Sequence, residues 1–177
     1  MRYTSVPQTE NLNSHKAIFL AGGDLVKLKV GDTAPDFSLL NEHGLPTNLK
    51  DYLGRNNVVL YFYPKDFTSG CTTEACSFRD DYKLYQEKGA LVIGVSLDSV
   101  ESHLKFSEKY NLPFAILSDR NKEAAKAYGV LGIGGFLTKR ITFIINKNGK
   151  ITHIFPKVDV KHHSEEVLEA LEELEKT

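Results

Sequence analysis

The period of the apolar residues changes several times along the chain, which predicts strands and helices in alternation. Continuous apolar, β-branched and aromatic runs such as NVVLYFY and LVIGVS are typical of strands that are buried on both faces of a sheet. Elsewhere the apolar residues step by three and four, as on one face of a helix. We expect strands at 57–63, 91–96 and 114–117, and helices at 71–88, 99–110 and 122–128.

The two ends of the pattern are less regular. VKLKV predicts a short strand before Gly31, residues 37–40 a second extended piece, and NEHGLP (41–46) a turn. Near the C-terminus, ITFIIN and ITHIF flank KNG, which predicts a β-hairpin over 141–155. Ser164 has the residue type and position expected of the N-cap of a final helix.

This order of elements predicts an α/β fold. Strands joined through helices imply a parallel part of the sheet, and the hairpin adds an antiparallel edge. We therefore expect a three-layer sandwich with a mixed central sheet, formed by a domain of residues 27–177. Residues 1–26 have mixed polarity and no sustained period, so we interpret them as an N-terminal extension with the composition of a flexible terminus. A tail without function is the simplest interpretation of that extension.

Composition excludes several classes of function. The chain has 177 residues and a formal net charge of −1, and it lacks the dense Lys/Arg run that a nucleic-acid-binding face would need. No stretch approaches the ~18 apolar residues of a membrane span. The apolar run AIFLA near the N-terminus is short and flanked by polar residues, so we expect no signal peptide and a cytoplasmic protein.

Both cysteines of the chain lie in YFYPKDFTSGCTTEACSFRD (61–80). Cys71 falls where a buried strand gives way to a helix, and ligands of α/β proteins bind at this end of a strand. The first turn of a helix favours a thiolate, because its backbone N–H groups are unpaired and its dipole is positive there. The thiolate is the nucleophile, and a free thiol with a pKa near 8.5 is only about 3% ionised at pH 7. A nearby cation would help, and Arg140, Lys65 and Arg79 are candidates, although each could equally be a solvated surface charge.

The spacing of Cys71 and Cys76 argues against a permanent disulfide. Residues five apart in a helix are separated by about 7.5 Å of rise and about 140° of rotation, which places their Cα atoms about 8–9 Å apart. A disulfide needs Cα atoms within about 7 Å. If both cysteines lie on the helix, they can bond only after about one turn unwinds. A cycle between a helical dithiol and a locally unfolded disulfide fits this spacing.

A metal or nucleotide site is not expected. Cys-x4-Cys supplies two ligands where structural zinc normally has four, and the six histidines show no ligand spacing with the cysteines. His162 and His163 are predicted to lie in a solvated loop. GVLGIGGFL (129–137) is rich in glycine, but no strand–turn–helix order accompanies it, so we interpret it as a flexible connector.

Three segments carry a resemblance to a known family. Pro64, Thr68 and Cys71 form a P-x3-T-x2-C frame that resembles the active-site motif of the peroxiredoxins. The continuation CTTEACSFRD resembles the subfamily known as bacterioferritin comigratory protein or peroxiredoxin Q. VGDTAPDF (30–37) resembles the opening segment of the family, and KRITFIIN (139–146) resembles its arginine-bearing strand.

The resemblance, which covers about residues 27–175, implies a thioredoxin-like fold and the reduction of peroxides by a thiol. It implies that Cys71 is the peroxidatic cysteine and Cys76 the resolving cysteine. Thr68 would hydrogen-bond the thiolate and the peroxide, Arg140 would stabilise the thiolate, and Pro64 would shield it from solvent.

The same resemblance implies the substrates and partners. These are hydrogen peroxide and organic hydroperoxides, with an external dithiol such as thioredoxin as reductant, in a monomer that needs no metal, haem or flavin. Glu74 matches a position that is commonly acidic, whereas Ser69 and Ser77 depart from the subfamily, which often has proline and aspartate there. Two other classes of function remain open on the residues alone, namely a thiol–disulfide exchange protein and a redox-sensing module.

Overall fold

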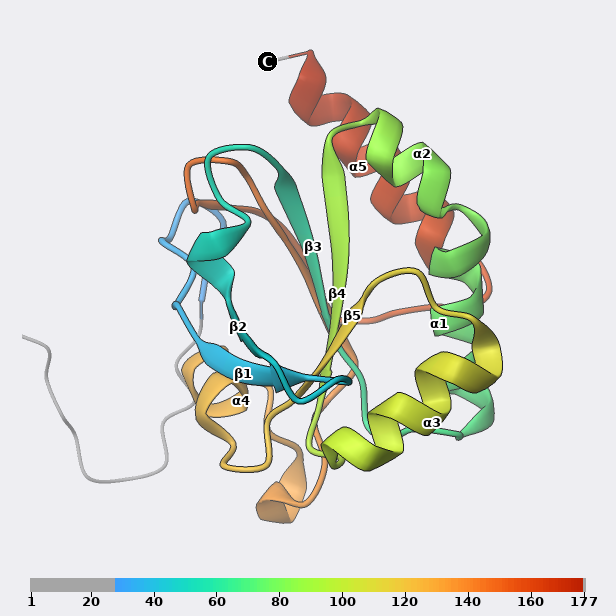
Figure 1. Cartoon of the computed structure of the whole chain (residues 1–177). Coiled ribbons are helices and arrows are strands. Elements are labelled where there is room, and N and C mark those ends of the chain that lie inside the picture. The colour runs from blue at the N-terminus through green and yellow to red at the C-terminus, as the bar shows by residue number, and fades with distance from the viewer. Residues whose placement is uncertain (1–27, 177) are drawn as a thin grey trace, which may run out of the picture.

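A mixed β-sheet forms the middle layer of the molecule (Figure 1). The computed structural model describes residues 28–176, and within them seven strands form one sheet in the order β2-β1-β5-β4-β3-β6-β7. Strand β3 runs parallel to β4 and β4 parallel to β5, while the other pairings are antiparallel. The strands are β1 (Ser38–Asn41), β2 (Pro46–Asn48), β3 (Asn57–Phe62), β4 (Ala90–Ser96), β5 (Ala115–Ser118), β6 (Ile141–Ile145) and β7 (Ile151–Phe155).

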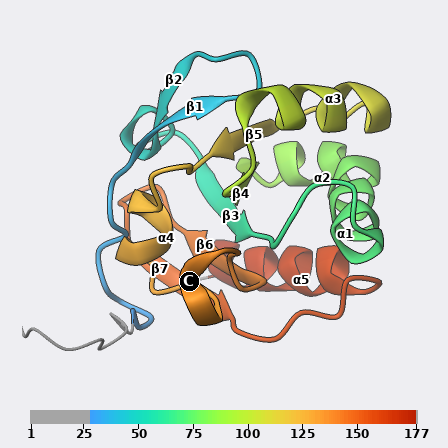
Figure 2. The ribbon, with the colours of Figure 1, turned by 90° about the horizontal axis from the view of Figure 1, so that it is seen from below.

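Helices cover both faces of this sheet (Figure 2). One face carries α1 (Ser69–Asp80), α2 (Tyr82–Glu87), α3 (Val100–Tyr110) and α5 (His163–Glu175). The other face carries α4 (Glu123–Ala127) and the 3₁₀ helix η1 (Leu49–Asp51). A second 3₁₀ helix, η2 (Ile133–Gly135), lies in the connection to β6. The three-layer α/β architecture predicted from the sequence is confirmed.

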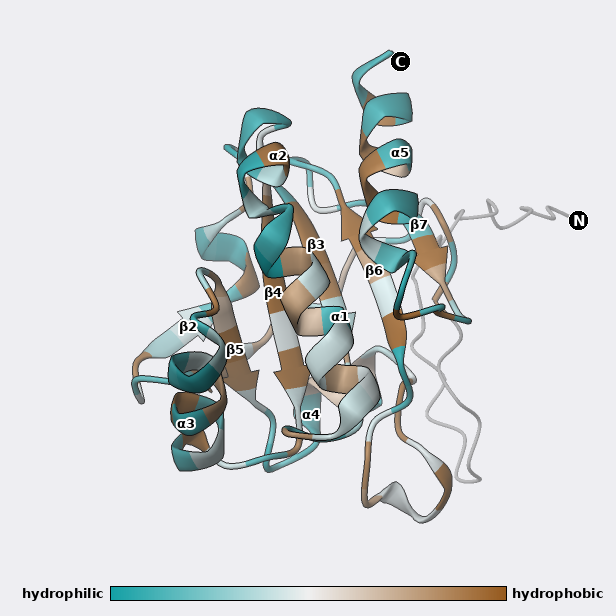
Figure 3. Cartoon of the chain, turned by 90° about the vertical axis from the view of Figure 1, so that its right-hand side faces the viewer, coloured by the Kyte–Doolittle hydropathy of each residue, from teal (hydrophilic) through white to brown (hydrophobic). Residues whose placement is uncertain are grey.

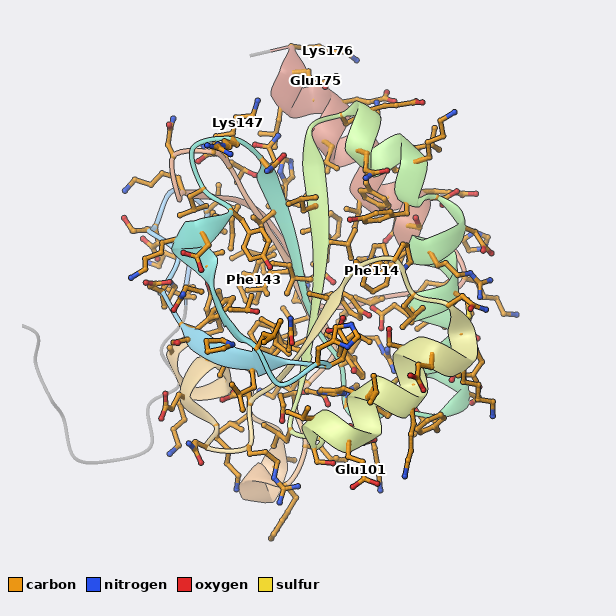
Figure 4. All side chains as sticks on the ribbon, in the orientation of Figure 1. Glu101, Phe114, Phe143, Lys147, Glu175 and Lys176 are labelled. Carbon is orange, nitrogen blue, oxygen red and sulfur yellow. The ribbon has the colours of Figure 1, made fainter. Side chains whose placement is uncertain are left out.

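Strand β3 separates two hydrophobic cores. Its residues 58–62 are fully buried, and alternate side chains enter the core on either face. Figure 4 labels one residue of each core, Phe143 on the side of α4 and Phe114 on the side of α1 to α3. Figure 3 shows central strands with many hydrophobic residues, and helices α2, α3 and α5 with many hydrophilic ones. Because both faces of β3 are packed in this way, the residue that follows the strand is held at a defined place.

Three predicted elements differ from the structure. No strand appears in residues 28–30, the described part of the segment predicted as a strand before Gly31. Strand β2 was not predicted, because its first residue, Pro46, was assigned to the turn of residues 41–46. Proline is nevertheless compatible with an edge strand, and β2 lies at the edge of the sheet. The helix predicted as one segment over 71–88 begins earlier, at Ser69, and breaks at Asp81 into α1 and α2.

The start of α5 also differs from its prediction. Ser164 is not the N-cap; it lies inside the first turn, where its hydroxyl donates to Asp81 Oδ2 at 2.7 Å. His162 is exposed as predicted, but His163 is buried and its Nε2 lies 2.8 Å from Thr142 Oγ1 on β6. The predicted extension of residues 1–26 lies outside the described residues. No helix within residues 28–176 is both long and apolar enough to span a bilayer.

Candidate active site

Cys71 occupies the first turn of α1, directly after the loop of residues 64–68 that leaves β3. Thr68 is the N-cap, with an extended backbone, and its carbonyl accepts the first helical hydrogen bond. The Cys71 side chain is 1% exposed and belongs to the core between α1 and the sheet. The unpaired N–H groups and the positive dipole end of α1 are therefore beside the sulfur, which favours the thiolate.

Arg140 supplies the cation at this sulfur. Its Nη2 lies 3.2 Å from Cys71 Sγ, and its Nη1 donates to Glu74 Oε2. Arg140 directly precedes β6, whose first residue pairs with the last residue of β3, so two neighbouring strands bring the guanidinium to Cys71. Burial by itself would lower the pKa of Arg140, but Glu74 and Cys71 outweigh it and the pKa lies above its ordinary value.

Glu74 shares the guanidinium with Cys71. Its side chain is 0% exposed, and its Oε1 has no hydrogen-bond partner among the described residues. Burial raises the pKa of Glu74 to about 7, against the opposing effect of Arg140. Near neutral pH the carboxyl therefore changes between its neutral and ionised forms beside the sulfur. This position, which the sequence marked only as commonly acidic, is part of the site.

The other predicted residues lie on the loop before α1. Pro64 is half-buried at its start, and the Thr68 hydroxyl donates to the Lys65 carbonyl at 3.1 Å. Of the alternative cations, Lys65 is exposed, and Arg79 is engaged with Asp80 and with the Tyr110 carbonyl. The structure thus brings Arg140, rather than either alternative, to Cys71.

Cys76 lies further along the same helix and is half-buried. It borders an open groove of about 480 Å³. The other lining residues are Thr72, Thr73, Ser77, Asp80 and Asp81. Both cysteines are free, and the α1 helix between them is uninterrupted, as the spacing predicted. In the residues that the structure describes, no three His, Cys, Asp or Glu side chains gather as a set that could hold a metal ion.

Comparison with known proteins identifies the family. Residues 30–154 match the AhpC/TSA family. The chain is 44% identical to Peroxiredoxin Bcp of Bacillus subtilis over 153 residues, which cover 83% of this chain and 97% of that protein. The chain belongs to the AhpC/TSA family of peroxiredoxins. As a peroxiredoxin it is a thiol-dependent peroxidase, and the activity that the sequence predicted is confirmed.

This peroxiredoxin is also similar to a plant protein and to a solved structure. It is 41% identical to the chloroplastic Peroxiredoxin Q of Sedum lineare over 150 residues, which cover 84% of this chain and 80% of that protein. The solved structure of the Xanthomonas campestris bacterioferritin comigratory protein, described in connection with alkyl peroxide reduction, matches with a TM-score of 0.75. That match has 33% sequence identity and covers 85% of this chain and 99% of that chain. The thioredoxin-like peroxiredoxin fold is confirmed.

Sequence reasoning missed a polar cluster behind the loop of this peroxiredoxin site. Asp66 lies within the loop, yet it is buried and bonded to His103 of α3. The available signal was an aspartate two residues after Pro64, directly behind a buried strand and ahead of the helix that carries Cys71. Its partner could not be found in this way, because His103 lies 37 residues further along the chain.

Proposed function

We propose that Cys71 is the peroxidatic cysteine of this peroxidase and Cys76 its resolving cysteine. The contact of 3.2 Å between Arg140 Nη2 and Cys71 Sγ, in the first turn of a helix, carries this proposal. Two independent sources of positive potential, the guanidinium and the helix end, act on one sulfur. Cys76 lies further along the same helix, beyond its first turn, and is half-buried.

In the first step, the Cys71 thiolate attacks the terminal oxygen of a peroxide. An S–O bond forms, the O–O bond breaks, and the sulfur is oxidised to a sulfenic acid. The departing oxygen takes up a proton from solvent and leaves as water or an alcohol. Arg140 donates hydrogen bonds where negative charge develops, which lowers the barrier of the step.

The loop of residues 64–68 shapes the space that the peroxide occupies in this proposal. The Thr68 hydroxyl now donates to the Lys65 carbonyl, and its rotation would direct the same hydrogen toward the thiolate or the peroxide. Pro64 is half-buried at the start of the loop and would limit the access of water to the sulfur. Both roles come from the family resemblance and are supported by the position of the loop directly before Cys71.

In the second step, the first part of α1 unwinds and the Cys76 thiol attacks the sulfenic sulfur. The S–O bond breaks, a disulfide forms and water leaves. Unwinding is necessary because a regular helix holds the two Cα atoms beyond disulfide range. An external dithiol, which we propose to be thioredoxin-like, then reduces the disulfide by thiol–disulfide exchange and is itself oxidised.

We also propose hydrogen peroxide and organic hydroperoxides as substrates, a monomeric state and a cytoplasmic location. Alkyl peroxide reduction by the related Xanthomonas campestris protein supports the organic substrates. Relatives with both bacterial and chloroplastic names exist, so cell fractionation is the appropriate test of location. Light scattering of the reduced and oxidised protein tests the monomer, and it would also show whether residues 1–26 alter assembly when they are removed.

A coupled assay tests the catalytic assignment. Peroxide consumption is followed with thioredoxin, thioredoxin reductase and NADPH, using hydrogen peroxide and one organic hydroperoxide. We expect NADPH oxidation that requires both the peroxide and thioredoxin, and a Cys71–Cys76 disulfide in protein that is quenched before reduction. A disulfide-exchange protein or a sensor would reduce a disulfide substrate, or change conformation, without consuming peroxide. Unimpaired turnover in Cys71→Ser would refute the assignment.

A further inference from the structure

A buried polar cluster lies behind the loop that precedes Cys71. Asp66 belongs to the loop and is only 4% exposed. Its Oδ1 accepts a hydrogen bond from Tyr63 Oη at 2.7 Å, and its Oδ2 accepts one from Ser102 Oγ at 2.6 Å. The same Oδ2 lies 2.8 Å from Nδ1 of His103, which is 0% exposed. The cluster therefore joins the loop to α3.

The contacts of His103 indicate which protonation state of its ring is favoured. Nδ1 faces the Asp66 carboxylate, and Nε2 lies 3.2 Å from the Leu117 carbonyl of β5, which can only accept a hydrogen bond. Burial alone would raise the pKa of Asp66, but the hydrogen bond and charge of His103 hold it below its ordinary value. Tyr63 Oη also lies 3.4 Å from Nδ1, but its hydrogen is donated to Asp66. Both ring nitrogens therefore face acceptors, an arrangement that favours a doubly protonated ring paired with the Asp66 carboxylate.

The backbone of the loop is fixed at the same residue. The Asp66 N–H donates to Asp98 Oδ2 at 2.9 Å, and that oxygen also accepts from Ser96 Oγ. Phe67, the next residue, has a φ of 61°, a left-handed conformation that is costly for a bulky side chain. Its ring packs against Phe106 of α3 at a centroid distance of 5.2 Å. Such a conformation persists only where its surroundings determine it.

We propose that the Asp66–His103 ion pair is a positioning device, which holds the loop of residues 64–68 in the conformation that receives peroxide and opposes the unwinding of α1. The proposal rests on the assignment of Cys71 as the peroxidatic cysteine. Asp66 and His103 are positioning residues, because they act through the backbone of the loop. Thr68, the N-cap, follows Phe67 directly, and Cys71 lies in the first turn after it, so a change in the loop displaces the start of the helix.

The proposal predicts opposite effects on the two chemical steps. Weakening the pair misplaces the loop and slows the attack of Cys71 on peroxide. The same change removes stabilisation from the folded loop, so the unwinding that lets Cys76 reach the sulfenic acid becomes faster. A general loss of stability would not slow the oxidation of Cys71 and at the same time speed the formation of the disulfide.

Stopped-flow kinetics of His103→Gln and Asp66→Asn test this division. Each variant keeps the approximate size of the side chain and removes its charge. We expect the second-order rate of Cys71 oxidation to fall about tenfold or more, and the first-order rate of disulfide formation to rise about threefold. Tyr128→Phe is the matched control, because Tyr128 Oη donates to the Pro35 carbonyl within the core on the opposite face of the sheet. It should lower stability by the loss of one hydrogen bond and leave both rates unchanged.

Rates that are unchanged in both variants, or that fall together in both steps, would overturn the proposal. A second measurement needs no peroxide and does not depend on the folding of a variant. Nitrogen-15 NMR of the histidine rings in the reduced wild-type protein at pH 7 should show both nitrogens of His103 protonated. A neutral His103 ring would also overturn it. Wild-type protein that fails to consume peroxide would instead refute the proposed function, and leave the ring measurement as an independent test of the pair.

Discussion

The two cysteines share one helix but have different surroundings. Cys71 is 1% exposed, lies at the positive end of α1 and has a guanidinium nitrogen 3.2 Å from its sulfur. Cys76 is half-buried beside an open groove of about 480 Å³. The comparison teaches that one sulfur is prepared for reaction by fixed charges, whereas the other depends on a change of backbone conformation to take part.

The two ends of α1 differ in a corresponding way. At the C-terminal end, Arg79 Nη1 donates to the Tyr110 carbonyl at 2.8 Å, and Asp81 Oδ2 accepts from Ser164 Oγ at 2.7 Å. Phe78 is buried in the core beside them. The helix is therefore fixed to α3 and α5 beyond Cys76, and we expect unwinding to involve residues 69–77 and to stop before Phe78.

The largest effect should come from removing the Cys71 sulfur. Cys71→Ser has no thiolate in the first turn of α1, so peroxide consumption should fall to the rate measured without enzyme. The coupled assay with thioredoxin measures it. Cys76→Ser is the control, because it should still consume one equivalent of peroxide per chain in a single turnover, whereas Cys71→Ser should consume none.

Removal of the Cys76 sulfur should affect only the formation of the disulfide and not the reaction of Cys71 with peroxide. Cys76→Ser should consume one equivalent of peroxide per chain and then stop, because no internal thiol can resolve the sulfenic acid. Rapid-quench measurement of peroxide and trapping of the sulfenic acid check this. Continued turnover with thioredoxin alone would mean that Cys76 is not needed for resolution.

Loss of the Arg140 guanidinium should lower the reactivity of the Cys71 sulfur without abolishing it. Arg140→Ala should reduce the rate of Cys71 oxidation about 100-fold, since one preorganised donor at the site of developing charge is removed. Ultraviolet absorbance of the thiolate at pH 7 should fall as well. Lys65→Ala removes an exposed cation from the neighbouring loop, and an equal effect there would argue against a specific role for Arg140.

A smaller effect should appear in the pH dependence of stability. The pKa of Glu74 is about 7 in the folded protein, against an ordinary value of 4.5, so the folded state holds this proton to higher pH. Its stabilising contribution is complete below pH 4.5 and is lost as the pH rises through 7. Relative to Glu74→Gln, the wild type should lose on the order of 3 kcal/mol of unfolding free energy between these limits. Urea unfolding at several pH values measures the difference, and parallel curves would contradict it.

The parts of the fold that could be predicted are those set by local pattern. The apolar run of β3 and the end of that strand before Cys71 follow from the residues themselves. Arg140 was only one of three candidate cations on local grounds, because it lies 69 residues from Cys71; the family resemblance singled it out. Contacts over such distances leave no periodic signal in one sequence.

The wrong predictions have the same origin. His163 reads as a solvated loop residue, yet packing of α5 on β6 buries it beside Thr142. Ser164 has the residue type of an N-cap, but its hydroxyl is used by Asp81, 83 residues away. The break of the long helix lies at this same Asp81. Polarity and spacing report the preference of a segment, whereas these positions are determined by the partners that the fold supplies.

The most direct test of the account measures where α1 opens when the disulfide forms. Reduced protein and protein treated with one equivalent of peroxide are compared by hydrogen exchange and mass spectrometry, which also locates the disulfide. We expect a Cys71–Cys76 disulfide with faster exchange across residues 69–77 and unchanged exchange in α2 and beyond. A Cys71–Cys76 disulfide without faster exchange in residues 69–77, or one equivalent of peroxide consumed with Cys71 left unoxidised, would contradict the account.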